Sequence, residues 1–196
     1  MNKYKGVFNM NNSIYIVTDG SSITANNKTG FDAAAAYVIY VNGKEVHRES
    51  ILLRDHTNNY AEMYAIYKGT KYVLDNMVEN HNCNEIMVIT DSQLCEKSLN
   101  EWMKGWLKKA TNETLMSTTG EVKNQELIKS AYINILSLQL YVPVYICHIN
   151  SHNNESKIPQ MYKKFTDKYF DIDLETFKMI FEGNQIVDKM AYEKLN

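Results

Sequence analysis

Three consecutive strand-like segments near the start of the chain constrain its fold more than any other feature. Residues 13–19 alternate apolar and polar side chains, and residues 31–41 continue as a strand of small and apolar residues. The second segment ends in Asn42-Gly43, a dipeptide that favours a two-residue hairpin turn, so residues 44–53 are predicted to return beside it. The three segments together predict an antiparallel meander.

After residue 53 the pattern changes from strand to helix. Apolar residues recur at helical spacing from Asn58 to about Asn76, and residues 85–90 form a short apolar run typical of a buried parallel strand. The remaining predicted elements are helices near 92–109 and 123–139, a fifth strand at 142–148, and a helix from Asn184 to Leu195 with Asn184 as its N-cap. This order predicts an α/β chain of the α+β type, with a five-stranded mixed sheet flanked by helices.

Composition and length bound the class of protein. A chain of 196 residues is long enough for one core, so we expect a single domain over 1–196 with residues 1–12 as an N-terminal extension. No apolar run approaches the roughly 20 residues that span a bilayer, which excludes a membrane protein. Cys83, Cys95 and Cys147 show no disulfide or metal-ligand spacing, which fits a reducing compartment. We therefore expect a soluble, cytoplasmic protein.

Carboxylates stand at two predicted strand ends and near one helix start. Asp19 in TDGSS is predicted to end the first strand, Asp91 in ITDSQ to end the fourth, and Glu62 lies in the first turns of a helix patterned for burial. Each Asp taken alone also suits a turn or a helix cap. Carboxylates that gather in one cleft are usually neutralised by a divalent cation, and oxygen ligands favour Mg²⁺ or Mn²⁺. Spacing alone does not show that these three side chains converge.

The motifs TDGSS, TNNYAE, ITDSQ, the pair His148 and His152, and the terminal NQIVDKMA follow one another in an order that resembles ribonuclease H type 1. The resemblance covers nearly the whole chain from about residue 13. It implies an RNase H-like fold and endonucleolytic hydrolysis of the RNA strand of RNA–DNA hybrids, leaving 5′-phosphate and 3′-hydroxyl ends. It also implies two Mg²⁺ ions, with Mn²⁺ as an alternative, and four carboxylates as metal ligands and catalytic residues: Asp19, Glu62, Asp91 and Asp188.

In this resemblance Asp19 bridges both ions, Glu62 and Asp91 complete one site, and Asp188 completes the other. His152 takes the place of the family's mobile-loop histidine, which moves protons and helps release product. A zinc pair formed by His148 and His152 is the weaker interpretation, because neither lies on an evident helix and no further ligands are near.

The resemblance also implies residues that bind the hybrid. The matching positions are Thr57, Asn58, Asn59 and Gln93, for phosphate and minor-groove contacts, and Trp102, Lys104, Lys108 and Lys109, for the DNA strand. Telling RNA from DNA requires polar side chains that reach the 2′-hydroxyl. Helix capping at Asn58 and an inward-packed Trp on a solvated helix are the structural alternatives. The net charge of −2 provides no global basic field, so such binding must use local patches.

Near its C-terminal end the chain departs from the family pattern. Ser151 stands where a Gly usually precedes the loop histidine, and residues 153–183 form a predicted helical insertion that either covers apolar surface or meets substrate phosphates. Asp171 and Asp173 are rivals to Asp188 for the fourth carboxylate, but they look like helix caps. Two other functions remain open, a nuclease of this fold that acts on DNA and a non-catalytic nucleic-acid-binding module. No obligate protein partner is evident.

Overall fold

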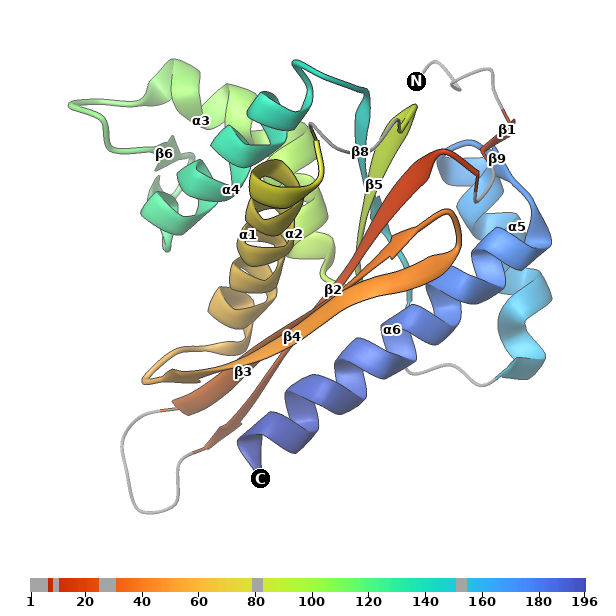
Figure 1. Ribbon diagram of the computed structural model, residues 1–196. Coiled ribbons are helices and arrows are strands. Elements are labelled where there is room, and N and C mark those ends of the chain that lie inside the picture. The colour runs from red at the N-terminus through yellow and green to blue at the C-terminus, as the bar shows by residue number, and fades with distance from the viewer. Residues whose placement is uncertain (1–6, 9–10, 25–30, 79–82, 151–154) are drawn as a thin grey trace.

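A five-stranded mixed sheet forms the centre of the molecule (Figure 1). The computed structural model describes residues 7–8, 11–24, 31–78, 83–150 and 155–196. In chain order the strands are β2 (Ser13–Thr24), β3 (Phe31–Val41), β4 (Lys44–Arg54), β5 (Glu85–Thr90) and β8 (Val144–His148). They lie in the order β4-β3-β2-β5-β8, with β2, β3 and β4 antiparallel and β2, β5 and β8 parallel. The predicted fold class is confirmed.

The antiparallel meander is built as its sequence predicts. Asn42 and Gly43 have φ angles of 53° and 72°, the left-handed conformation that a tight hairpin turn requires. One expectation is wrong, because β2 does not end at Asp19. It continues to Thr24, and Gly20 to Ser22 pair with the small residues Ala33 to Ala35 of β3.

Helices cover both faces of the sheet (Figure 1). On one face α1 (Asn58–Asn76) packs on β2 and β3, with α4 (Gln125–Leu138) against it. On the other face α6 (Leu174–Leu195) crosses β2, β3 and β4. The alternation along β2 explains this, since Ile14 and Ile16 belong to the apolar cluster with α1 and α4, while Tyr15 and Val17 belong to the cluster with α6.

The predicted helix over 92–109 is present, but it is not uniform. It consists of α2 (Gln93–Lys97), a π-helical turn (Ser98–Trp102) and α3 (Met103–Lys109). The connection that follows contains a short hairpin of β6 (Met116–Ser117) and β7 (Gly120–Glu121).

The segment before the last helix is helical, as predicted. A 3₁₀ turn (Glu155–Lys157) leads into α5 (Ile158–Lys168), and β9 (Asp171–Ile172) pairs with β1 (Val7–Phe8). Phe165, Phe177 and Phe181 are buried, whereas Lys163 and Lys164 are exposed.

The last helix begins ten residues before the predicted start, so the expectation for Asn184 is wrong. Asp173 is the N-cap, and its Oδ1 accepts a hydrogen bond of 2.7 Å from the Thr176 amide. Asn184 is instead a buried residue inside α6, and Gly183 lies against Tyr40 and Val17. In the described part of the chain, none of the helices combines the length and the apolar character that crossing a membrane requires.

Candidate active site

The register of the two central parallel strands brings Asp19 and Asp91 together. The β2–β5 ladder ends at the pair Thr18 and Thr90, so each Asp is the first residue past that pair on its own chain. Asp19 remains in β2 because β3 continues beside it, whereas Asp91 leaves the sheet and precedes α2. The two carboxylates therefore share one edge of the parallel ladder, as ligand sites in such sheets commonly do.

Glu62 reaches this edge because β2 and α1 are in direct contact there. A Cβ atom on Gly20 would lie 2.3 Å from the Glu62 nitrogen, so only glycine permits this approach. Thr57 caps α1, and its side chain accepts a hydrogen bond from the Tyr60 amide. Asn58, in the first turn of the helix, donates from Nδ2 to Glu62 Oε1 at 2.8 Å. The glutamate is thereby oriented by its own helix.

Asp188 approaches from the opposite face of the sheet, on α6. Asp19 follows the alternation of Tyr15 and Val17, whose side chains pack toward α6, and so lies on the same side. The negative charge of Asp188 is close enough to raise the Asp19 pKa. All four predicted carboxylates thus lie around one end of the β2–β5 pair.

Within this cluster the pKa of Asp19 is strongly raised. Burial, then the charge of Asp91 and a hydrogen bond with its carboxyl, and finally the charge of Asp188 raise the pKa of Asp19 to about 9, against the opposing effect of the Gly20 amide. That amide donates to Asp19 Oδ1 at 2.7 Å. Burial and the charge of Asp91 also raise the pKa of Glu62, although a hydrogen bond with Ser92 acts in the opposite direction. At neutral pH the cluster requires a bound proton or a cation.

Two oxygen atoms indicate that a cation suits the cluster better than a proton does. Glu62 Oε2 and Asp91 Oδ1 are buried and accept no hydrogen bond. Buried acceptors without a donor are costly, and a hard divalent cation satisfies several at once. The donor set of carboxylates alone suits Mg²⁺ or Mn²⁺. Among the described residues no three His, Cys, Asp or Glu side chains are already grouped to hold one ion, so binding requires the carboxylates to close in.

The predicted substrate-binding residues divide into two groups. Thr57, Asn59 and Gln93 are exposed beside the carboxylates, at the first turns of α1 and α2, whereas Asn58 is committed to Glu62. The capping alternative for Asn58 is wrong, because Thr57 is the N-cap of α1. The alternative of an inward-packed Trp holds for Trp106, which packs on the core.

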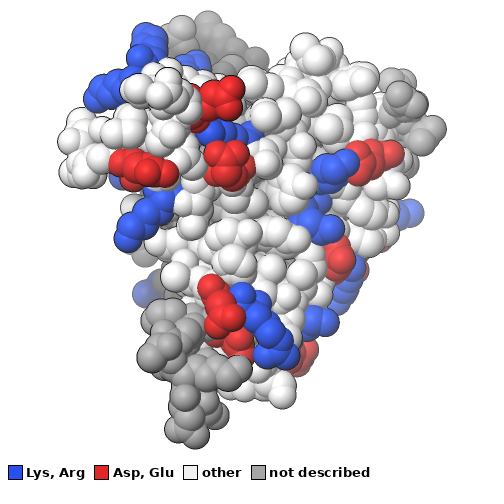
Figure 2. All heavy atoms as spheres, turned by 90° about the vertical axis from the view of Figure 1, so that its left-hand side faces the viewer, with Lys and Arg blue, Asp and Glu red and all other residues white. Residues whose placement is uncertain are grey.

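The second group lies on the π-helical turn and α3. Lys104, Lys108 and Lys109 are exposed, and Trp102 is exposed with its ring 5.7 Å from that of Trp106. The face in Figure 2 shows basic side chains interspersed with acidic ones, in keeping with the low net charge.

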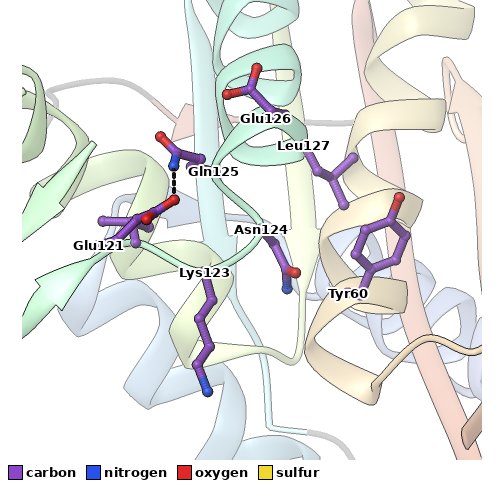
Figure 3. A pocket seen from close by; sticks show the side chains of 8 residues that line it. Tyr60, Glu121, Lys123, Asn124, Gln125, Glu126 and Leu127 are labelled. Carbon is purple, nitrogen blue, oxygen red and sulfur yellow. Dashed lines mark hydrogen bonds between the residues drawn. The ribbon is translucent and has the colours of Figure 1, made fainter. Parts of the chain in front are cut away.

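A groove of about 550 Å³ lies next to Glu62's helix (Figure 3). Tyr60 of α1 forms one wall, and the residues that lead into α4, Glu121 to Leu127, form the other. Lys123 and Asn124 lie in the loop that leads into α4, and Gln125 Nε2 donates to Glu121 Oε1 at 2.6 Å. The motifs of the sequence did not predict this groove.

Of the two histidines in the predicted site, the described part of the chain contains His148 but not His152. His152 lies outside the described residues, as does Ser151. His148 ends β8, and its Nε2 is 3.0 Å from the main-chain oxygen of Asp91. Burial, followed by the charge of Lys168, lowers the pKa of His148. A zinc pair gains no support from this contact.

The chain matches the RNase H family over residues 11–170, a stretch that contains three of the four carboxylates but not Asp188. It is 37% identical over 97 residues to Ribonuclease H of Campylobacter jejuni subsp. jejuni serotype O:23/36 (strain 81-176), which is 49% of this chain and 58% of that protein. It is 26% identical over 157 residues to Ribonuclease H of Campylobacter curvus (strain 525.92), covering 80% of this chain and 95% of that protein. The chain therefore spans little more than half the length of its C. jejuni relative.

Solved structures of viral proteins share this fold. The RNase H domain of PFV superposes with a TM-score of 0.63 at 21% identity, covering 92% of each chain. A foamy viral protease-reverse transcriptase in complex with RNA/DNA hybrid superposes with a TM-score of 0.68 at 20% identity, covering 98% of this chain and 21% of that one. The likeness supports the fold. By the match over residues 11–170, the chain belongs to the RNase H family.

Proposed function

We propose that this protein is a ribonuclease H that cuts the RNA strand of RNA–DNA hybrids endonucleolytically, leaving 5′-phosphate and 3′-hydroxyl ends. The observation that carries the proposal is the buried Asp19 carboxyl, whose pKa is raised to about 9 by burial and by Asp91. A family member that only bound nucleic acid would gain nothing from keeping this unfavourable charge. Hydrolysis of phosphodiesters uses such a cluster.

The residues that would hold the cofactor are Asp19, Glu62, Asp91 and Asp188. Two Mg²⁺ ions bound there, with Mn²⁺ as an alternative, would activate the attacking water and stabilise the leaving oxygen. Asn58 keeps Glu62 oriented, and the Gly20 amide keeps Asp19 oriented, so these two carboxylates would hold their direction while the cluster closes in on the ions. Asp188, on a long helix docked from the other face, closes the site.

Recognition of the hybrid is assigned to side chains beside the cluster. Thr57, Asn59 and Gln93 are exposed at the starts of α1 and α2 and present the polar groups that minor-groove and 2′-hydroxyl contacts need. The exposed groups of the π-helical turn and α3 meet the DNA strand: Trp102, Lys104, Lys108 and Lys109. The complex of a similarly folded viral protein with RNA/DNA hybrid supports this substrate class.

His152 is assigned to proton transfer and product release, as in the family it resembles. Cytoplasmic location is proposed as well, since Cys83, Cys95 and Cys147 are free thiols.

Cleavage assays on matched substrates test the proposal. The same sequence is offered as RNA–DNA hybrid, duplex DNA and duplex RNA, with Mg²⁺ and with excess chelator. We expect cleavage of the hybrid's RNA strand alone, dependent on the metal, and lost in Asp19→Asn. Cleavage of duplex DNA in place of the hybrid would identify a DNA-directed nuclease, and hybrid binding without cleavage would identify a binding module; either result overturns the proposal.

A further inference from the structure

Glu96 is a buried carboxylate that the proposed chemistry does not use. It lies on α2, five residues after Asp91, and its side chain is 5% exposed. Three donors surround its Oε1: Asn100 Nδ2 at 3.3 Å, Lys168 Nζ at 3.4 Å and the Tyr169 hydroxyl at 3.3 Å. A carboxylate withdrawn from water is costly unless it is paired and hydrogen-bonded, so this arrangement holds together the elements that supply the donors.

Tyr169 connects Glu96 to the outer strand of the sheet. Among the described strands, β8 pairs with β5 alone. The Ile149 amide points toward β5 and donates to Thr90 O at 3.0 Å. The neighbouring His148 amide therefore points away from β5, toward the open edge. It donates to the Tyr169 hydroxyl at 2.8 Å, so this hydroxyl accepts from β8 while it donates to Glu96.

His148 carries the connection on to Asp91. Its Nε2 lies 3.0 Å from the Asp91 carbonyl oxygen, and because a carbonyl only accepts, this nitrogen must carry the hydrogen. The contacts form a closed circuit, from Asp91 along α2 to Glu96, through Tyr169 to His148, and back to the Asp91 main chain. Asn100 Nδ2 adds a tie between the π-helical turn and β8 by donating to Ile146 O at 2.9 Å.

We propose that Tyr169 is a positioning residue for the metal site, acting through His148 to fix the main chain at Asp91. It is not among the residues assigned here to substrate or metal. The inference rests on the proposed function, in which Asp91 holds Mg²⁺, and it gives the segment that follows α5 a role in activity beyond covering apolar surface. Groups that orient a metal ligand typically change affinity or activity by about 10- to 100-fold when removed.

Tyr169→Phe tests the inference because it removes only the hydroxyl. The ring and its contacts are kept, including Phe165 at 5.0 Å between centroids and Lys168 Nζ at 4.7 Å from the ring. We expect Mg²⁺ affinity, measured by calorimetry without substrate, to fall about 10-fold or more. The kcat should fall with it, while KM for the hybrid stays at the wild-type value. His148→Phe breaks the same circuit from the other side and should have the same effect.

Tyr162→Phe is the matched control. Tyr162 is a half-buried tyrosine on α5 whose hydroxyl donates to Ile172 O at 2.7 Å, with no contact to the Asp91 circuit. It should keep wild-type Mg²⁺ affinity and kcat. Wild-type Mg²⁺ affinity in Tyr169→Phe, or an equal loss in Tyr162→Phe, overturns the inference. A wild-type chain that binds Mg²⁺ but leaves hybrids intact defeats the proposed function alone, and one that binds no Mg²⁺ defeats both.

Discussion

A buried carboxyl such as Asp19 makes the stability of the metal-free protein depend on pH. Its pKa is raised to about 9 by burial and by Asp91, against about 3.9 in an unfolded chain. Between these values the folded state keeps a proton that the unfolded state gives up. The stabilisation present below about pH 4 is therefore lost progressively as the pH rises to about 9.

Thermal unfolding in excess chelator, measured across that window, checks this expectation. The melting temperature of the wild type should fall with rising pH, and Asp19→Asn should flatten the curve because an amide does not titrate. Asp167→Asn changes an exposed carboxyl on α5 and should retain the wild-type slope. An Asp19→Asn curve as steep as that of the wild type would locate the titration elsewhere.

Asn58 and Asn59 are neighbours in different surroundings, since Asn58 donates to Glu62 and Asn59 is exposed. Asn58→Ala removes the donor to Glu62 Oε1 and leaves both oxygens of that carboxylate without a hydrogen bond from α1. We expect kcat to fall about 10-fold with KM little changed, as for other groups that orient a metal ligand. Asn59→Ala alters an exposed side chain and should raise KM instead. Steady-state kinetics on the hybrid separate the two, and the reverse pattern would exchange their roles.

At the scale of elements, the contact between β2 and α1 depends on Gly20. In Gly20→Ala the new Cβ would meet backbone atoms of α1, at 2.3 Å from Glu62 N and 2.6 Å from Ala61 C, so the helix must move. We expect a loss of about 1–3 kcal/mol in unfolding free energy, the usual cost of overpacking. Gly105→Ala is the control, because its Cβ would meet nothing within 4 Å on α3. Denaturant unfolding should show that variant as stable as the wild type or slightly more so.

The long helix α6 carries Asp188, the candidate for the fourth carboxylate of the cluster. Asp188→Asn should abolish turnover, since it removes charge beside Asp19. Asp173→Asn should retain both fold and activity, because asparagine caps a helix as well as aspartate does. Asp171→Asn changes an exposed residue of β9 and should be equally mild. Hybrid cleavage by the three variants decides the assignment, and a severe loss at Asp173 would reverse it.

Local patterns predicted where most elements lie, but not the end of β2 or the start of α6. The alternation of apolar and polar residues and the Asn-Gly turn predicted the meander, and the helical spacing of apolar residues predicted α1. Gly20 and the serines after it suggested a turn, yet pairing with the small residues of β3 keeps them in the sheet. Asn184 suggested an N-cap, yet it lies inside α6, where the neighbouring Gly183 packs closely on Tyr40 and Val17. In both cases a tertiary contact overrode the local preference.

For the whole molecule, the candidate site was predictable from motifs but its supports were not. The four carboxylates follow from the resemblance, and the shared register of Thr18 and Thr90 gives the physical reason why two of them meet. The circuit through Glu96 and Tyr169 joins positions 73 residues apart. No periodicity in a single sequence signals such a pair.

The placement of α6 also orders events during synthesis. Asp19 lies in β2, whereas Asp188 lies in the last helix, α6, which packs on the sheet from one face (Figure 1). A nascent chain emerges from the ribosome N-terminal end first, so the meander, α1 and β5 are free to fold while α6 is still unmade. The mutually repelling carboxylates are thus brought together in two steps, and the candidate site is completed only when α6, which carries Asp188, docks on the sheet.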